Sequence, residues 1–145
     1  MSTIPVKTGT ATGIQAKSID HITIVVGDLQ RSIDFYGQVL GMERIDRPDF
    51  GFPGAWFQAG KAQIHMNVTG PEAGQAGLPD LGSSQPSRGF HYAFEVDSCD
   101  GAADRLRSHG IEIITGPRSR PDGWRQVYIY DPDHHLIELC SPPSP

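Results

Sequence analysis

The sequence predicts an α+β fold made of two copies of one module, each running strand, helix, strand, strand, strand. Segments rich in β-branched and aromatic residues surround one capped, amphipathic segment in each half of the chain. The halves align without large gaps, since His21 and His91 lie just inside the first strand of each copy. Gly41 and Gly110 then follow the two helices after nearly equal spacing. A chain of 145 residues is long enough for a core, so we expect residues 18–141 to form a single domain.

Module one is expected at residues 18–68. It follows a leader rich in Thr, Gly and Ser, residues 1–17, which has no periodicity and is predicted to be flexible. Asp28 is a candidate helix N-cap, and Gly41 is a candidate C-cap. The predicted elements are, in order, a strand over 19–26, a helix over 29–40, a strand over 42–46, a loop over 47–54, and a hairpin of strands 55–58 and 63–68.

Module two is expected at residues 89–141, after a linker or flexible active-site loop over 69–88 in which Gly, Pro and Ser recur without pattern. Ser98 or Asp100 caps its helix. The predicted elements are a strand over 90–96, a helix ending near 109, a strand over 111–115, a loop over 116–123, a hairpin over 124–140 and a Pro-rich tail over 142–145. Arg118 and Arg120 are interpreted as solvated residues of the 116–123 loop.

Composition narrows the classes of function. The formal net charge is −5 and no Lys/Arg run is present, which argues against nucleic acid as a partner. No apolar run of about 18 residues exists, so no membrane span is expected. The N-terminus lacks the apolar region of a signal peptide. The two cysteines, Cys99 and Cys140, are interpreted as reduced thiols, and the expected location is the cytoplasm.

Glu138 is the unusual residue of the last strand, because its neighbours there are all apolar. A buried carboxylate must be protonated, ion-paired or bound to a metal. The repeat aligns His21 with His91, and Ile-His-Met around His65 with Ile-Glu-Leu around Glu138. A single strand histidine is more often a hydrogen-bonded structural residue. Four such residues at repeat-related positions instead favour a divalent metal site, if the copies form one curved sheet.

Three segments also resemble a known family. They are I-D-H-I-T-I-V-V-G-D-L-Q-R-S-I-D-F-Y-G-Q-V-L-G-M, F-H-Y-A-F-E-V-D and Y-D-P-D-H-H-L-I-E-L. Over residues 19–140 the chain is similar to the vicinal oxygen chelate superfamily, which includes glyoxalase I, fosfomycin-resistance thiol transferases, methylmalonyl-CoA epimerase, extradiol dioxygenases and bleomycin-resistance proteins. The resemblance implies two βαβββ modules in a cup-shaped mixed sheet, a divalent metal inside, a small-molecule substrate and a homodimer.

By motif position the resemblance implies that His21, His91 and Glu138 are metal ligands and that His65 occupies the fourth ligand position. Glyoxalase I has Glu at that fourth position, which departs from the His65 of this chain. The Asp-Pro-Asp-His-His turn also departs from the usual Asp-Pro-Asp-Gly-Asn. His134 and His135 are therefore interpreted as exposed turn residues.

The expected activity is that of a divalent-metal-dependent, glyoxalase-I-like lyase or isomerase. It would act on a small α-carbonyl compound or its thiol adduct through a metal-chelated enediolate. Glu138 is the expected catalytic base, and His65 assists as a neutral base. The metal is Ni, Zn, Mn, Co or Fe(II), and glutathione or another thiol is a candidate co-substrate. The expected substrate-binding residues are Phe50, Phe52, Trp56, Arg125 and Tyr128, although the three aromatics are equally typical of an ordinary core cluster.

Two alternatives stay open. One is an Fe(II)-dependent extradiol-type dioxygenase on a catechol-like substrate, with His21, His91 and Glu138 as a 2-His-1-carboxylate triad. The other is a thiol transferase or a metal-free binding or resistance protein for a small molecule.

Overall fold

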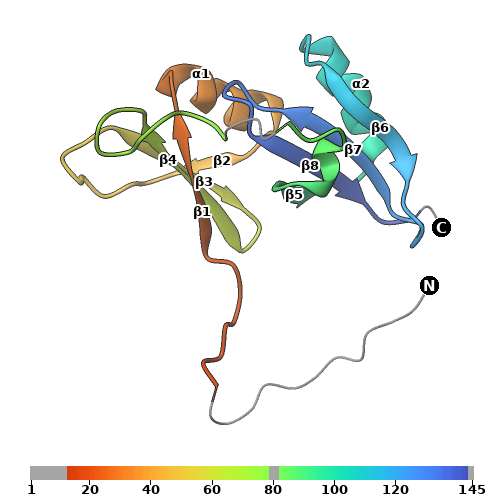
Figure 1. The fold of residues 1–145 in the computed structure, drawn as a ribbon, viewed down its shortest axis with the longest axis horizontal. Helices are drawn as coiled ribbons and strands as arrows, with labels where there is room; N and C mark the ends of the chain where they lie inside the picture. Colours follow the sequence, from red (N-terminus) through yellow and green to blue (C-terminus); the bar gives the residue numbers. More distant parts are fainter. Residues whose placement is uncertain (1–12, 79–81, 144–145) are drawn as a thin grey trace.

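The computed structural model describes residues 13–78 and 82–143. Figure 1 shows two groups of strands side by side, with helix α2 (Cys99–Ser108) at the outer side of the second group. Module one contains β1 (His21–Val26), α1 (Leu29–Asp34), the π-helix η1 (Phe35–Val39), β2 (Glu43–Ile45), β3 (Gly54–Ala59) and β4 (Ala62–Val68). After the 3₁₀ turn η2 (Pro86–Arg88), module two contains β5 (Tyr92–Glu95), α2, β6 (Ile113–Ser119), β7 (Arg125–Tyr130) and β8 (Leu136–Ser141).

The two modules repeat one topology. Module one forms a four-stranded sheet of order β1-β4-β3-β2, and module two forms a four-stranded sheet of order β5-β8-β7-β6. In each sheet the first strand pairs in parallel with the last strand, and the other pairs are antiparallel. The α+β fold with two βαβββ modules is thereby confirmed. Each chain has two separate mixed sheets, with β1 and β5 at sheet edges.

The helix caps follow the sequence. The Asp28 side chain accepts a hydrogen bond from the Arg31 N–H, and the Ser98 side chain accepts one from the Gly101 N–H. Gly41 has φ of +68°, which glycine adopts without strain. The segment predicted as one helix over 29–40 is an α-helix to Asp34 and a π-helix from Phe35, so its register changes midway.

Two connecting segments differ from their predicted structure. The loop predicted over 116–123 is wrong in its first half, because β6 continues to Ser119 with two irregular steps in its pairing to β7. The segment predicted as a linker over 69–88 contacts module one, since the Gly77 N–H donates to the Val25 carbonyl at 3.0 Å. Residues 1–12 of the predicted leader and residues 144–145 of the tail lie outside the described residues. No helix of the described ranges is long and apolar enough to cross a membrane.

Both modules share one hydrophobic core. Buried residues of β1, β3 and β4 pack in the same cluster as buried residues of α2, β7 and β8. A buried polar network also joins the modules, because the Tyr36 hydroxyl lies 2.6 Å from the Tyr92 hydroxyl and donates to Asp131 at 2.7 Å. The modules are therefore one folding unit in which the two sheets are held at a fixed mutual position.

The β7–β8 turn corrects one expectation. His134 is exposed, with φ of +65°, as an exposed turn residue would be. His135 is buried at 3% exposure, and its Nδ1 lies 2.7 Å from an Asp131 carboxylate oxygen. The prediction that His135 is exposed is wrong, because this carboxylate provides a partner inside the protein that turn chemistry alone does not reveal.

Candidate metal centre

In module one, strand alternation brings the predicted histidines to one face of the sheet. His65 on β4 lies opposite Trp56 on β3, and their rings stack with centroids 3.9 Å apart. His21 on β1 stacks on the other side of His65 at 4.0 Å. Phe50 and Phe52 extend this aromatic row beyond Trp56. The opposite face carries the buried side chains of the core.

Each of these two histidines has one ring nitrogen engaged with an oxygen. Nδ1 of His21 lies 2.7 Å from a carboxylate oxygen of Asp20, and Nε2 of His65 lies 2.8 Å from the Gln63 amide oxygen. An oxygen acceptor fixes the proton on the ring nitrogen that faces it, so the other nitrogen of each ring keeps a lone pair. Burial and the neighbouring His21 lower the pKa of His65, which favours its neutral form.

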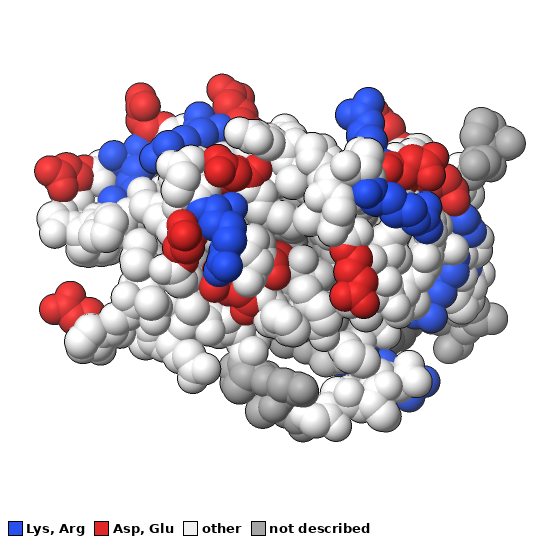
Figure 2. Space-filling model, turned by 90° about the horizontal axis from the view of Figure 1, so that it is seen from above, with Lys and Arg blue, Asp and Glu red and all other residues white. Residues whose placement is uncertain are grey.

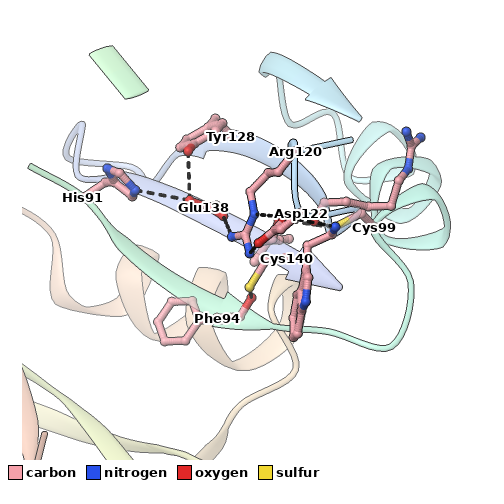
Figure 3. Close-up of polar contacts among 11 residues, drawn as sticks. His91, Phe94, Cys99, Arg120, Asp122, Tyr128, Glu138 and Cys140 are labelled. Atoms are coloured by element: carbon pink, nitrogen blue, oxygen red, sulfur yellow. Dashed lines mark hydrogen bonds and ion pairs between the residues drawn. The ribbon is translucent and has the colours of Figure 1, made fainter. Parts of the chain in front are cut away.

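In module two, Glu138 is surrounded by donors, as Figure 3 shows. The carboxylate is 5% exposed and lies on β8, an inner strand of its sheet. The Tyr128 hydroxyl donates to Oε1 at 2.8 Å, and His91 Nε2 lies 3.2 Å from the same oxygen. Nη1 of Arg120 donates to Oε2 at 3.3 Å. Burial and the carboxylate together raise the pKa of Tyr128 to about 12, so its hydroxyl stays protonated as a donor.

The contact between His91 and Glu138 needs a cation or an additional proton. His91 Nδ1 lies 2.9 Å from the Gly89 carbonyl oxygen, which can only accept, so Nδ1 carries a proton. Neutral His91 then turns the lone pair of Nε2 toward the carboxylate oxygen. Two lone pairs that face each other are stabilised when a proton or a metal ion lies between them.

The structure brings the four predicted ligands together as two pairs. His21 contacts His65 in module one, and His91 contacts Glu138 in module two. Within the described ranges, no three or more His, Cys, Asp or Glu side chains gather in a cluster that could hold a metal ion. Among the described residues the predicted ligands therefore form two separate pairs, which are called half-sites below.

The predicted substrate-binding residues do not all lie on the sheet faces that carry the half-sites. Tyr128 and Trp56 lie on the faces that carry the half-sites, while Phe50 and Phe52 are 51% and 48% exposed at the end of the aromatic row. Arg125 lies on the other face of β7, where its guanidinium binds Asp100 of α2 at 2.6 and 3.2 Å. Arg125 thus has a structural partner that holds α2 to the sheet.

The interpretation of Arg120 as a solvated loop residue missed its contact with Glu138. Its position in the hairpin between β6 and β7 carries no periodicity that would assign it to a face. One signal was available: the hairpin is short, so a long side chain within it can reach the neighbouring strand β8 on the face of Glu138 and Tyr128.

The chain as a whole is similar to known proteins of one superfamily. Residues 18–139 match the model of the Glyoxalase/Bleomycin resistance protein/Dioxygenase superfamily. The chain is 32% identical over 132 residues to the glyoxalase domain-containing protein RDO1 of Mycosarcoma maydis, covering 88% of this chain and 70% of that one. It is 29% identical over 133 residues to lactoylglutathione lyase of Escherichia coli O157:H7, covering 82% and 88%. A putative glyoxalase family protein from Bacillus anthracis superposes with a TM-score of 0.71 at 28% identity, covering 90% of this chain and 99% of that one.

Proposed function

The chain belongs to the glyoxalase/bleomycin resistance protein/dioxygenase superfamily, and from that premise we propose that it is a divalent-metal-dependent enzyme of the glyoxalase type. It acts as a lyase or isomerase on a small α-carbonyl compound or on its thiol adduct, with glutathione or another thiol as co-substrate. Its similarity to a lactoylglutathione lyase supports this class of reaction. The two free cysteines agree with a reducing compartment, so we also propose that it works in the cytoplasm.

The donor set is the observation that carries the proposal. His21, His65 and His91 each have one ring nitrogen beside an oxygen acceptor and the other nitrogen free of that acceptor. This pattern is typical of histidines that ligate a metal, because the acceptor fixes the tautomer and the ring orientation. Glu138 adds one carboxylate. Three neutral imidazoles and a carboxylate suit Zn²⁺, Ni²⁺, Co²⁺, Mn²⁺ or Fe²⁺, so the residues present fit the metal.

A second copy of the chain is required to complete the set. We propose a homodimer in which His21 and His65 of one protomer meet His91 and Glu138 of its partner. An open groove of about 1420 Å³ lies between β1, β4, β5 and α2. It supports the proposed homodimer, because it offers a surface for a second copy of the chain. Ile19 and Phe90 at this groove are 65% and 68% exposed, which is unusual for large apolar side chains.

The chemistry assigns separate tasks to the residues. When bound, a divalent ion supplies Lewis-acid polarisation of the substrate carbonyl. Glu138 is the base that removes a proton from one carbon and returns it to the neighbouring carbon. Tyr128 keeps its proton and donates to the Glu138 carboxylate, which holds that base in one orientation. Burial lowers the pKa of His65 and so favours its neutral form, which assists this proton transfer from the module-one half-site.

Trp56, Phe50 and Phe52 provide an apolar wall beside His65 and His21. An apolar wall excludes water from a reacting carbanion and binds the hydrocarbon part of a substrate. We propose that these aromatics contact the substrate. Arg125 is left out of the substrate site, because Asp100 occupies its guanidinium on the other face of the sheet.

The test is elemental analysis of protein purified without chelators or affinity metals, followed by reconstitution with single divalent ions. We expect about one ion per chain and turnover of the hemithioacetal of methylglyoxal and glutathione. His91→Gln should lose the ion, while His134→Gln should keep it, because His134 is an exposed histidine outside the donor set.

Other outcomes would replace the proposal. Iron together with oxygen consumption on catechols would favour the dioxygenase reaction. No bound ion and no stabilisation by any divalent ion would exclude a metal enzyme and favour a binding protein.

A further inference from the structure

Arg120 makes an unexpected contact with the half-site of module two. Its Nη1 lies 3.3 Å from Oε2 of Glu138, while Tyr128 and His91 contact the other oxygen, Oε1. The Arg120 side chain is 31% exposed and that of Glu138 is 7% exposed. Arg120 is thus the charged residue between this half-site and solvent.

The guanidinium of Arg120 is held in place by its own hairpin. Nε and Nη2 donate to the two carboxylate oxygens of Asp122 at 3.1 and 2.7 Å, which is a bidentate pair. The same carboxylate accepts from the Trp124 N–H at 3.1 Å, and the guanidinium lies over the Trp124 ring at 5.5 Å. Such a supported arginine loses little entropy when it binds an anion. Figure 3 shows Nη1 directed away from Asp122 toward the carboxylate of Glu138.

Competition for Glu138 decides what Nη1 binds in the working site. A divalent ion and the Arg120 guanidinium both draw on the Glu138 carboxylate, while Asp122 already binds Nε and Nη2 of Arg120. Glu138 cannot serve both cations equally, so Nη1 gains a free donor position when the carboxylate turns to the ion. An oxyanion beside the reacting carbonyl would satisfy that donor.

We propose that Arg120 is a substrate-recognition residue and that the substrate carries a carboxylate within a few bonds of its metal-binding oxygens. The inference rests on the proposed function, since it assumes a metal at Glu138. Arg125 is bound to Asp100 across the sheet, and Arg107 lies on the outer surface of α2. Arg118 lies on the same face of the sheet as Tyr128, but its side chain is exposed, and Arg120 is the arginine that contacts Glu138. Substrates in this class are small oxo or hydroxy acids, or thiol adducts of oxo acids.

The test compares two hydroxamates on the cobalt-loaded full-length protein by calorimetry. Both bind a metal through two neighbouring oxygens, and succinohydroxamate differs from butyrohydroxamate by a carboxylate in place of the terminal methyl group. We expect the wild type to prefer succinohydroxamate by about tenfold or more, the scale of one charge-assisted hydrogen bond. Arg120→Met should abolish the preference but still bind butyrohydroxamate, and Arg107→Met should keep it.

Several outcomes distinguish failure of the inference from failure of the proposed function. If the wild type binds neither cobalt nor either hydroxamate, the proposed function fails. If both hydroxamates bind equally to the wild type, or if Arg120→Met retains the preference, Arg120 does not recognise the substrate. Should Arg120→Met not fold, Arg120→Gln replaces it, because Gln keeps a polar group beside Asp122. A loss of binding for both hydroxamates in a folded Arg120 variant would assign Arg120 a purely structural role and overturn the inference.

Discussion

At the scale of a single residue, Glu138 depends on its donors. A carboxylate that is 5% exposed on an apolar strand would be costly without hydrogen bonds. The Tyr128 hydroxyl is its shortest contact at 2.8 Å, and it lies directly across the β7–β8 pairing. Cross-strand pairing thus fixes donor and acceptor together before any ligand arrives.

Replacement of Tyr128 by Phe should reveal this support. We expect Tyr128→Phe to lower the free energy of unfolding of the metal-free protein by about 1–3 kcal/mol, because a buried carboxylate oxygen loses its donor. The folded pKa of Tyr128 is about 12, above the value of 10.0 for a free side chain. The stabilisation is therefore fully present below pH 10 and is lost as the pH rises toward 12. Urea denaturation of both proteins from pH 7 to 11.5 measures the difference.

Tyr130→Phe is the matched control, since Tyr130 lies on the same strand and face and no hydrogen bond of its hydroxyl is found among the described residues. It should show little loss at any pH. A Tyr128→Phe difference that stayed constant up to pH 11.5 would contradict the assignment of the hydroxyl as the donor to Glu138.

Residue-level prediction from the sequence succeeded where the internal repeat applies. The repeat alignment assigned His65 and Glu138 to the last strand of each module, where the structure has them, β4 and β8. It failed for Arg120, which lies in a hairpin turn with no period to assign its direction. It also failed for His135, because burial there depends on Asp131 and on Tyr36 of a distant helix.

At the scale of elements, the β7–β8 turn fastens module two to module one. Asp131 at its start accepts from the Tyr36 hydroxyl of η1 and from the backbone N–H groups of Asp133 and His135. Farther along the turn, Asp133 accepts from the Gly27 N–H that follows β1. These polar contacts therefore add to the shared hydrophobic core in holding the two sheets together.

Tyr36→Phe should weaken this connection. The variant leaves Asp131 without one donor and Tyr92 without its hydroxyl partner, at a cost of about 1–3 kcal/mol in unfolding free energy. Thermal or urea unfolding measures it. Because both modules share one core, we expect a single cooperative transition at lower denaturant. No loss of stability would show that the network does not help to join the modules, and two separate transitions would show that the shared core alone does not couple them.

Gly77 of the 69–88 segment lies against the same β7–β8 turn. Its φ is +79°, and a Cβ atom there would lie 2.0 Å from the Asp133 carbonyl oxygen. Gly74 has φ of +89° with nothing within 4 Å of such an atom, so Gly74→Ala meets backbone strain alone, about 1–2 kcal/mol. Gly77→Ala should destabilise the protein clearly more than Gly74→Ala in the same urea titration. Equal losses would mean that the close approach to Asp133 relaxes at no cost.

Element-level prediction was reliable where local signals dominate. The caps at Asp28 and Ser98 gave correct helix starts because each depends on side chains within a few residues. The extension of β6 through Gly116 and Pro117 was missed, since these residues usually end strands and only pairing with β7 keeps this strand in the sheet.

At the scale of the whole molecule, the charge distribution does not favour a strongly charged partner. Lys/Arg and Asp/Glu alternate on the face seen in Figure 2, without a large area of one sign. The two edge strands β1 and β5 border the open groove, and each carries a half-site histidine at or next to its start. A second copy of the chain would complete both half-sites at once. A twofold axis would place module one of each chain against module two of the other.

Complementation between two inactive chains tests this arrangement directly. One variant carries His21→Ala and His65→Ala, and the other carries His91→Ala and Glu138→Ala. Each homodimer lacks a complete ligand set. In a co-expressed mixture about half of the dimers are mixed, and each mixed dimer contains one complete site out of two, so about one quarter of the wild-type metal content should return. Elemental analysis of the separated mixed dimer should give about half an ion per chain.

The control mixture joins a His21→Ala chain to a His65→Ala chain. Both mutations fall in module one, so every shared site of that mixed dimer still lacks one histidine, and metal content should stay low. A site built within a single chain makes the opposite prediction for the first mixture, because each chain there carries a broken set and no metal returns. Recovery in the first mixture alone would therefore mean that the ligands come from two protomers, with the fold of each chain acting to hold its two half-sites apart.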